Sequence, residues 1–166
     1  MFLLAAITAL SLLLEVHASD AFKTMEEYCQ ENNFKVESYN ITTSDDYILS
    51  LYRIPGMIGE VEPSTPKPVV HFQHGWNGDM MQWVINNPEG ANAFILAKEG
   101  YDVWLGNNRG SAYGVHHKTL TTKDREFWNF YQRDMAEKDL PAFIDFILEK
   151  TGVETISYVG HSEGTT

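Results

Sequence analysis

The chain has 166 residues, of which 43% are hydrophobic and 13% aromatic, and this argues for one folded domain and against intrinsic disorder. Twelve basic residues against 23 acidic ones give a net charge of −11, so nucleic acid and anionic membrane surfaces are poor electrostatic partners. An acidic surface that keeps the protein in solution explains this charge without any particular partner.

The chain opens with an apolar run from Phe2 to Leu14. Val16-His17-Ala18 then has the small residues that a signal peptidase reads, so residues 1–18 are predicted to be a signal peptide cleaved after Ala18. An uncleaved anchor and a buried helix are the alternatives, although the run is short for a membrane span. Secretory entry would deliver the protein to the lysosomal lumen or to the outside of the cell.

Two further features bear on secretion. Asn40-Ile41-Thr42 is an N-glycosylation sequon, although such triplets also arise by chance. Cys29 is the only cysteine, so no disulfide forms within this chain. In an oxidising compartment a single cysteine is either buried or paired with a group outside the chain.

The first predicted elements are a short helix and a β-hairpin. The helix covers residues 23–32. The strand at 34–41 alternates apolar and polar residues, Ser44-Asp45-Asp46 is typical of a turn, and the strand at 47–54 returns. A loop with four prolines and two glycines follows at 55–68 and is not a domain boundary, because strand-like sequence resumes at once.

The middle of the chain alternates strands and helices. A short apolar strand at 69–72 is typical of a parallel strand buried on both faces. A helix is predicted over 91–99, with Gly100 at its C-terminal end, and a strand over 101–105 runs into the glycine-rich loop 106–114.

The last predicted helix covers 133–150 and is followed by a strand at 155–159. This alternation predicts an α/β fold, with a mostly parallel sheet flanked by helices and preceded by the hairpin. The apolar residues that recur at helical spacing in the helix are Met135, Leu140, Phe143, Ile144, Ile147 and Leu148.

Gly160-His161-Ser162-Glu163-Gly164 fits the nucleophile elbow G-x-S-x-G. In an elbow the serine sits on a strained turn between a strand and a helix, with its hydroxyl exposed above the sheet. An apolar strand precedes the motif, and its glycines allow close backbone approach. Ser162 is therefore the candidate catalytic nucleophile; a turn serine that caps a helix is the alternative.

Acyl transfer also needs hydrogen-bond donors for the developing oxyanion. In elbow enzymes one donor is the backbone N–H of the residue after the nucleophile, here Glu163, and another comes from a loop after an earlier strand. His74-Gly75-Trp76 follows such a strand, so the Trp76 N–H is the second candidate. An ordinary turn at His74-Gly75 is the alternative.

The other polar motifs do not indicate a cofactor. His71 and His74, with His116-His117, lack the cysteine or carboxylate spacing that completes a metal site. His161 is badly placed to act as a base for the adjacent serine. The loop Gly106–Gly110 lacks the Lys-Ser/Thr of a phosphate loop. Neither a metal nor an organic cofactor is expected.

Several segments together resemble one family, the acid lipases of the lysosomal and gastric type, which have the α/β-hydrolase fold. They occur in order from about Glu26 to the end of the chain. The matching segments are Asp46–Leu49, Arg53–Pro55, Gln73–Gly75, Phe94–Ala97, Tyr101–Asn107, Arg109-Gly110, Phe127-Trp128, Asp139–Ala142 and Tyr158–Ser162. Trp104, Phe127 and Trp128 are expected in the core or in a pocket lining.

The resemblance implies hydrolysis of neutral lipid esters, such as triacylglycerols and cholesteryl esters, at a lipid–water interface. It implies Ser162 as nucleophile and the N–H groups of Trp76 and Glu163 as the oxyanion hole. Residues 19–166 would be a partial α/β-hydrolase domain, because the family's catalytic acid and histidine come later in chain order than the nucleophile. A fragment of this kind is expected to be inactive, since the serine lacks its base.

Two residues depart from the family pattern. The family usually has glutamine after the nucleophile and leucine after His-Gly, whereas this chain has Glu163 and Trp76. The backbone donors survive both changes, but a carboxylate opposes a nearby oxyanion and the tryptophan narrows the space for an acyl chain. An esterase for non-lipid esters and a non-catalytic secreted binding or regulatory protein are the alternative functions.

Overall fold

The computed structural model describes residues 23–61, 63–86 and 88–165. The predicted signal peptide, residues 1–18, lies outside the described residues. Within these ranges, no helix combines the length and the apolar character needed to cross a bilayer.

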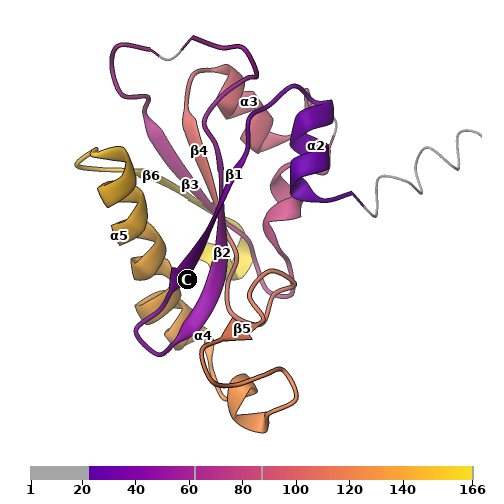
Figure 1. Cartoon of the computed structure of the whole chain (residues 1–166), viewed down its shortest axis with the longest axis vertical. Helices are drawn as coiled ribbons and strands as arrows, with labels where there is room; N and C mark the ends of the chain where they lie inside the picture. The colour runs from indigo at the N-terminus through magenta and orange to yellow at the C-terminus, as the bar shows by residue number, and fades with distance from the viewer. Residues whose placement is uncertain (1–22, 62, 87, 166) are drawn as a thin grey trace, which may run out of the picture.

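A six-stranded sheet forms the centre of the described region (Figure 1). Its strand order is β1-β2-β4-β3-β6, and β5 pairs with β2 beside this path. The strands are β1 (Glu37–Thr42), β2 (Tyr47–Ile54), β3 (Val69–Gln73), β4 (Asp102–Gly106), β5 (His116–His117) and β6 (Ser157–Gly160).

The sheet is mixed. β3 is parallel to β4 and β6, as the alternation of strands and helices predicted. β2 is antiparallel to β1, β4 and β5, so the predicted hairpin forms and continues into the sheet instead of standing apart from it. The turn between β1 and β2 is closed by the Thr43 N–H, which donates to the Tyr47 carbonyl over 2.9 Å, and Asp46 adopts a positive φ of 72°.

Alternate residues of β2 bury opposite faces of the sheet. Leu49 and Leu51 pack into one hydrophobic cluster with the helix α5 (Leu140–Thr151), whereas Tyr52 and Ile54 pack into another with α2 (Met25–Glu31) and α3 (Asn92–Lys98). Figure 1 shows α5 on one side of the sheet and α2 and α3 on the other. Every residue of β3 and β4 is buried, as parallel strands covered on both faces require.

Local hydrogen bonds fix the helix ends. Thr24 caps α2 through a capping box, because its side chain accepts from the Glu27 N–H while the Glu27 carboxylate accepts from the Thr24 N–H. Gly100 has a positive φ of 88° and follows Glu99, the C-cap of α3, and Gly152 has one of 71° at the end of α5.

The predicted regular helix over 133–150 is wrong in one respect. A π-helical segment, η3 (Met135–Asp139), lies between the short α4 (Gln132–Asp134) and α5, and the Leu140 N–H donates to the Met135 carbonyl five residues back. Pro141 near the start of α5 has no N–H to donate, and its ring would crowd the carbonyl four residues earlier. The wider turn relieves this conflict.

Other departures from the predicted elements are small. β1 begins at Glu37 instead of residue 34, because Phe34 forms an isolated bridge with Met57 and stacks on Phe94 at 4.4 Å between ring centroids. β6 begins at Ser157 instead of residue 155. The short β5 and the 3-10 helices at 80–83 and 125–128 were not predicted, because elements this short leave little periodicity in the sequence.

The order of the strands brings the carboxyl ends of three strands together at one end of the sheet. The chain leaves β3 through α3 to β4 on one side, and leaves β4 through α5 to β6 on the other side of β3. The carboxyl ends of β3, β4 and β6 therefore meet where the direction of winding reverses. Crevices at such points are the usual ligand sites of open α/β sheets.

Candidate active site

Ser162 lies directly beyond the carboxyl end of β6, as the first residue of the short 3-10 helix η4 (Ser162–Thr165). Its φ is +53°, a left-handed conformation that costs a residue with a side chain about 1–3 kcal/mol. The residue is exposed to solvent. This strained and accessible serine between a strand and a helix has the features of a nucleophile elbow.

The glycines of the motif are explained by close packing. A methyl group on Gly160 would overlap the Gly164 carbonyl, and one on Gly164 would lie 2.6 Å from the Gln73 carbonyl oxygen. The turn is also held by hydrogen bonds: the His161 N–H donates to the Gln73 carbonyl over 3.1 Å, and the Tyr158 hydroxyl donates to the Gly164 carbonyl over 2.6 Å. The elbow is thus tied to the end of β3.

The loop after β3 contacts the elbow. A methyl group on Gly75 would lie 2.9 Å from both the His161 carbonyl oxygen and the Ser162 Cβ atom, so only glycine fits there without displacement. Trp76, the next residue, is 70% exposed. Among the hydrogen bonds of the described residues, neither the Trp76 nor the Glu163 backbone N–H has an acceptor. Both N–H groups predicted as oxyanion donors are therefore unoccupied, and their role at Ser162 stays a prediction.

His74 joins the loops that follow β3 and β4. Its Nε2 atom accepts from the Asn108 N–H over 3.1 Å, so the proton resides on Nδ1, which donates to the Gly75 carbonyl over 2.8 Å. Burial lowers the pKa of His74. A neutral imidazole with both nitrogens engaged holds Gly75 in place and has no free atom with which to act as a base.

Amide side chains at the same end of the sheet extend this network. The Gln73 amide donates to the Asn108 side-chain oxygen over 2.9 Å. Asn107 accepts from the Met80 N–H over 3.0 Å and donates to the Ser50 carbonyl over 3.0 Å. Most of the groups in these hydrogen bonds are buried, so the bonds limit the movement of the loops after β3 and β4.

Arg109 anchors the loop after β4 through its bonds to two carboxylates, Asp45 and Asp139. Its side chain is 1% exposed and makes bidentate hydrogen bonds to Asp45 at 2.8 and 2.9 Å. It also bonds Asp139 of the π-helical segment, through Nε at 2.9 Å, Nη2 at 2.6 Å and the backbone N–H at 3.0 Å. The guanidinium carbon lies 4.0 Å from the centroid of the Tyr47 ring, within the range of a cation–π contact.

The pKa values in this cluster follow from burial and pairing. Burial opposes the charge of Arg109, but its bonds to the two carboxylates outweigh that effect and raise its pKa. Partial burial of Asp45 is outweighed by donors from Arg109, Lys138 and Thr43, which lower its pKa. Burial raises the pKa of Asp139, and the Arg109 donors oppose that rise.

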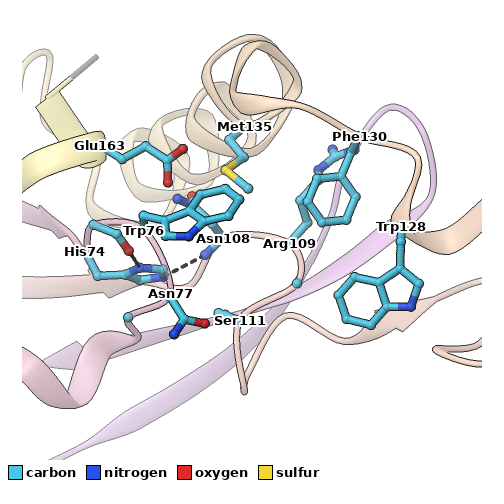
Figure 2. A pocket seen from close by; sticks show the side chains of 13 residues that line it. His74, Trp76, Asn77, Asn108, Arg109, Ser111, Trp128, Phe130, Met135 and Glu163 are labelled. Atoms are coloured by element: carbon cyan, nitrogen blue, oxygen red, sulfur yellow. Dashed lines mark hydrogen bonds between the residues drawn. The ribbon is translucent and has the colours of Figure 1, made fainter.

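A cavity of about 290 Å³ opens beside the elbow, between the loops after β3 and β4 and the π-helical segment (Figure 2). Most of its wall is apolar: Trp76, Trp128, Phe130 and Met135 line it. The Glu163 carboxylate also faces it, with the Oε1 atom buried and without a hydrogen-bond partner.

The predicted aromatic residues divide between core and cavity. Trp104 and Phe127 are fully buried, whereas Trp128 is 48% exposed and lines the cavity. His71 is buried between the rings of Phe143 and Tyr158, and burial lowers its pKa to about 4.

The described residues contain no group of three or more potential metal-ligating side chains. His116 and His117 form β5 and pair with β2. Of the two states expected of a single cysteine, buried or paired outside the chain, Cys29 is in the buried one. Burial raises its pKa to about 12.

Sequence reasoning did not assign Asp45, Arg109 and Asp139 to the site. Their only signal was that Arg109 and Asp139 belong to segments shared with the acid lipases. They are 30 residues apart in the chain, so no local pattern connects them.

Comparison with known proteins agrees with this architecture. The α/β-hydrolase fold family matches residues 68–166, which is more than half of the chain, and the partial α/β-hydrolase lipase region matches residues 25–87. The structure of a "putative lipase" from Sulfolobus solfataricus aligns with this chain at a TM-score of 0.58 and 20% identity. The alignment covers 80% of this chain and 39% of that one. An esterase from Pyrococcus furiosus covers 81% at 22% identity with a TM-score of 0.54, over 46% of its own chain. The chain belongs to the α/β-hydrolase family.

Within that family the chain is similar to acid lipases, in agreement with the resemblance found in the sequence. It is 50% identical over 133 residues to human lysosomal acid lipase/cholesteryl ester hydrolase, covering 80% of this chain and 33% of that protein. It is 46% identical over 147 residues to human lipase member M, covering 89% of this chain and 35% of that protein. The chain thus spans about a third of the length of these relatives.

Proposed function

We propose that this chain is the nucleophile-bearing part of a secreted or lysosomal lipase that hydrolyses neutral lipid esters. Ser162 is the proposed nucleophile, and the backbone N–H groups of Trp76 and Glu163 form the proposed oxyanion hole. The observation that carries the proposal is the strained φ of +53° at an exposed Ser162 packed against Gly75. The names of the lipase relatives support lipid esters as substrates.

The proposed reaction is acyl transfer through Ser162. A base removes the hydroxyl proton of Ser162 as its oxygen attacks the ester carbonyl, and the two N–H groups stabilise the negative charge that develops on the carbonyl oxygen. Collapse of this intermediate transfers the proton to the departing alcohol and leaves an acyl-serine. Water, deprotonated by the same base, then releases the carboxylic acid and restores the serine.

The base in this scheme is a histidine from outside the described residues. Within them the Ser162 hydroxyl has no hydrogen-bonded histidine, and both ring nitrogens of His74 are engaged. His161 precedes the serine, and its ring lies edge-on to Trp83, with 6.4 Å between centroids. The 166-residue chain alone should therefore show no measurable turnover of a short acyl ester.

A chimera tests the proposal. Residues 23–166 replace the matching segment of human lysosomal acid lipase, and hydrolysis of cholesteryl oleate and of a triacylglycerol is measured. The expected result is hydrolysis by the chimera and a loss of about a thousandfold with Ser162→Ala. Ser157→Ala, at an exposed serine of β6, is the matched control and should leave the rate unchanged.

The outcomes separate the alternative functions. A folded chimera whose hydrolysis is unaffected by Ser162→Ala, or which hydrolyses no ester, overturns the proposal and favours a binding or regulatory protein. Hydrolysis confined to short acyl chains favours an esterase for non-lipid esters. Turnover by the isolated 166-residue chain that Ser162→Ala abolishes would contradict the assignment of an external base.

A further inference from the structure

The cavity beside Ser162 contains an unusual combination of groups. Its wall includes the apolar side chains of Trp76, Trp128, Phe130 and Met135, and the polar residues Asn77, Asn108 and Ser111 also line it. Into this apolar space projects one acidic side chain, that of Glu163. Figure 2 shows its carboxylate directed toward Trp76 and Met135.

The charge of Glu163 is not neutralised by its surroundings. Its Oε1 atom is buried and accepts no hydrogen bond, and a buried carboxylate oxygen without a donor loses the interactions it has in water. Arg109 is the one basic residue among the described lining residues, but its guanidinium is occupied by Asp45 and Asp139. His74, which also lines the cavity, is neutral, with both ring nitrogens engaged.

These groups favour one class of ligand. An ammonium group would gain attraction from the Glu163 carboxylate and from the aromatic faces, which attract cations through their quadrupoles. A carboxylate in the same position would meet like charge in a space of low polarity, where charge interactions are weakly screened. An uncharged alkyl chain would be accepted by the apolar wall without either effect.

We propose that Glu163 makes this cavity charge-selective, so that it binds apolar ligands carrying an ammonium group or no charge and rejects ligands carrying a carboxylate. The proposal deepens the proposed function, because it names the substrate class of the same site. It also concerns the product: a fatty acid released beside Glu163 would be repelled from the cavity.

Binding of three matched probes to the 166-residue chain tests this inference. Decyltrimethylammonium, 1-decanol and decanoate share an alkyl chain and differ in charge at neutral pH, and each is used below its micellar or solubility limit. Tryptophan fluorescence reports binding, because Trp76 and Trp128 line the cavity. The ammonium probe should bind about tenfold more tightly than decanoate, with decanol between them.

Two variants separate a local effect from the overall negative charge. Glu163→Gln should reduce the ratio of ammonium to carboxylate affinity severalfold, leaving the smaller preference that the aromatic rings give. Glu154→Gln removes the same charge from an exposed glutamate and should leave the ratio as in the unaltered chain. Equal binding of the three probes, no binding of any of them, or a ratio that persists in Glu163→Gln would overturn the inference.

The binding test is independent of catalysis. Ser162→Ala should keep the affinity ratio, because the serine hydroxyl is not part of the charge selection. A chimera that fails to hydrolyse esters while the ratio stands refutes the proposed function alone. Serine-dependent hydrolysis together with charge-independent binding refutes only the role of Glu163.

Discussion

Gly75 and Ser162 lie so close together that a methyl group added to Gly75 would come within 2.9 Å of the Ser162 Cβ atom. The nearest atoms also include the His161 carbonyl oxygen at 2.9 Å, which belongs to the backbone and cannot rotate away. The loop after β3 and the elbow after β6 therefore depend on each other for their positions. The proposed oxyanion donors, one on each of these segments, share this dependence.

Gly75→Ala should push the two segments apart. In the chimera with human lysosomal acid lipase, we expect kcat to fall about 100-fold, the cost of losing one oxyanion donor, with little change in KM. Gly78→Ala is the milder comparison in the same loop, because its added methyl group would lie 3.3 Å from the Gln82 side chain and the Gly75 carbonyl oxygen, close but without the overlap at Gly75. Equal rates for the two variants would show that contact between the segments does not position the donors.

Ser162→Gly should make the 166-residue chain more stable than Ser162→Ala. Glycine adopts the φ of +53° without a steric penalty, whereas alanine keeps the strain, and we expect a difference in unfolding free energy of about 1 kcal/mol. Urea unfolding of both variants measures it. Ser157→Gly on β6 should instead lower the stability, since glycine weakens a strand. Equal stability of Ser162→Gly and Ser162→Ala would argue against a strained elbow.

Arg109→Met should destabilise the chain by about 3–5 kcal/mol, because it leaves the fully buried Asp139 carboxylate without its main partner. Arg109→Met combined with Asp139→Leu should recover much of this loss, since no buried charge then remains. Chemical denaturation of the single and double variants gives both values. A double variant less stable than Arg109→Met would mean that Asp139 is stabilised by groups other than Arg109.

The stability that Asp45 contributes should depend on pH. Its pKa is lower in the folded chain than in the unfolded chain, so on acidification the unfolded chain binds the proton first. The contribution is present above the ordinary aspartate pKa of about 3.9 and decreases as the pH falls below that value. Asp45→Asn should therefore lower the unfolding free energy by about 1–2 kcal/mol at pH 6 and by less at about pH 2.5.

The matched control for this measurement is Asp145→Asn, at an exposed aspartate of α5. It should change the stability little at either pH. An Asp45→Asn effect that stays constant from pH 6 to about pH 2.5 would contradict the assignment of the lowered pKa to Asp45.

Glu163→Gln in the chimera should raise the rate of ester hydrolysis more at neutral than at acidic pH. An ionised carboxylate beside the oxyanion opposes the negative charge of the transition state, and glutamine at this position carries no such charge. The ratio of variant to parent kcat/KM at pH 7.5 and pH 4.5 is the relevant measurement. A ratio that is equal at the two values, or smaller at pH 7.5, would reject the effect.

The fold was predictable from the sequence where hydrophobic patterns are long. The hairpin of β1 and β2, the apolar β3 and β4, and α5 are visible in periodicity, and the elbow motif marks the end of β6. The π-helical segment was missed because Met135, Leu140 and Phe143 still fit a helical repeat, and the register change arises from Pro141.

The site was predictable only in part. The elbow and the loop at Gly75 follow from a motif and from the strand before it. The cluster of Arg109 with Asp45 and Asp139 depends on contacts between residues 64 and 30 positions apart, which no single-sequence pattern encodes. The buried and unpartnered Glu163 oxygen depends on the shape of the cavity, and that shape exists only after the loops are placed.

The π-helical segment lets the continuous helix of α4, η3 and α5 contact two different surfaces, the cavity and the sheet. An extra residue in a turn rotates everything before it by about 100° relative to everything after it. Met135 thereby faces the cavity beside Ser162, while Phe143 and Ile147, further along the same helix, pack against the sheet. Deleting a single residue here would restore a regular helix and rotate either Met135 away from the cavity or Phe143 and Ile147 away from the sheet. The length of this segment is therefore as constrained as its composition.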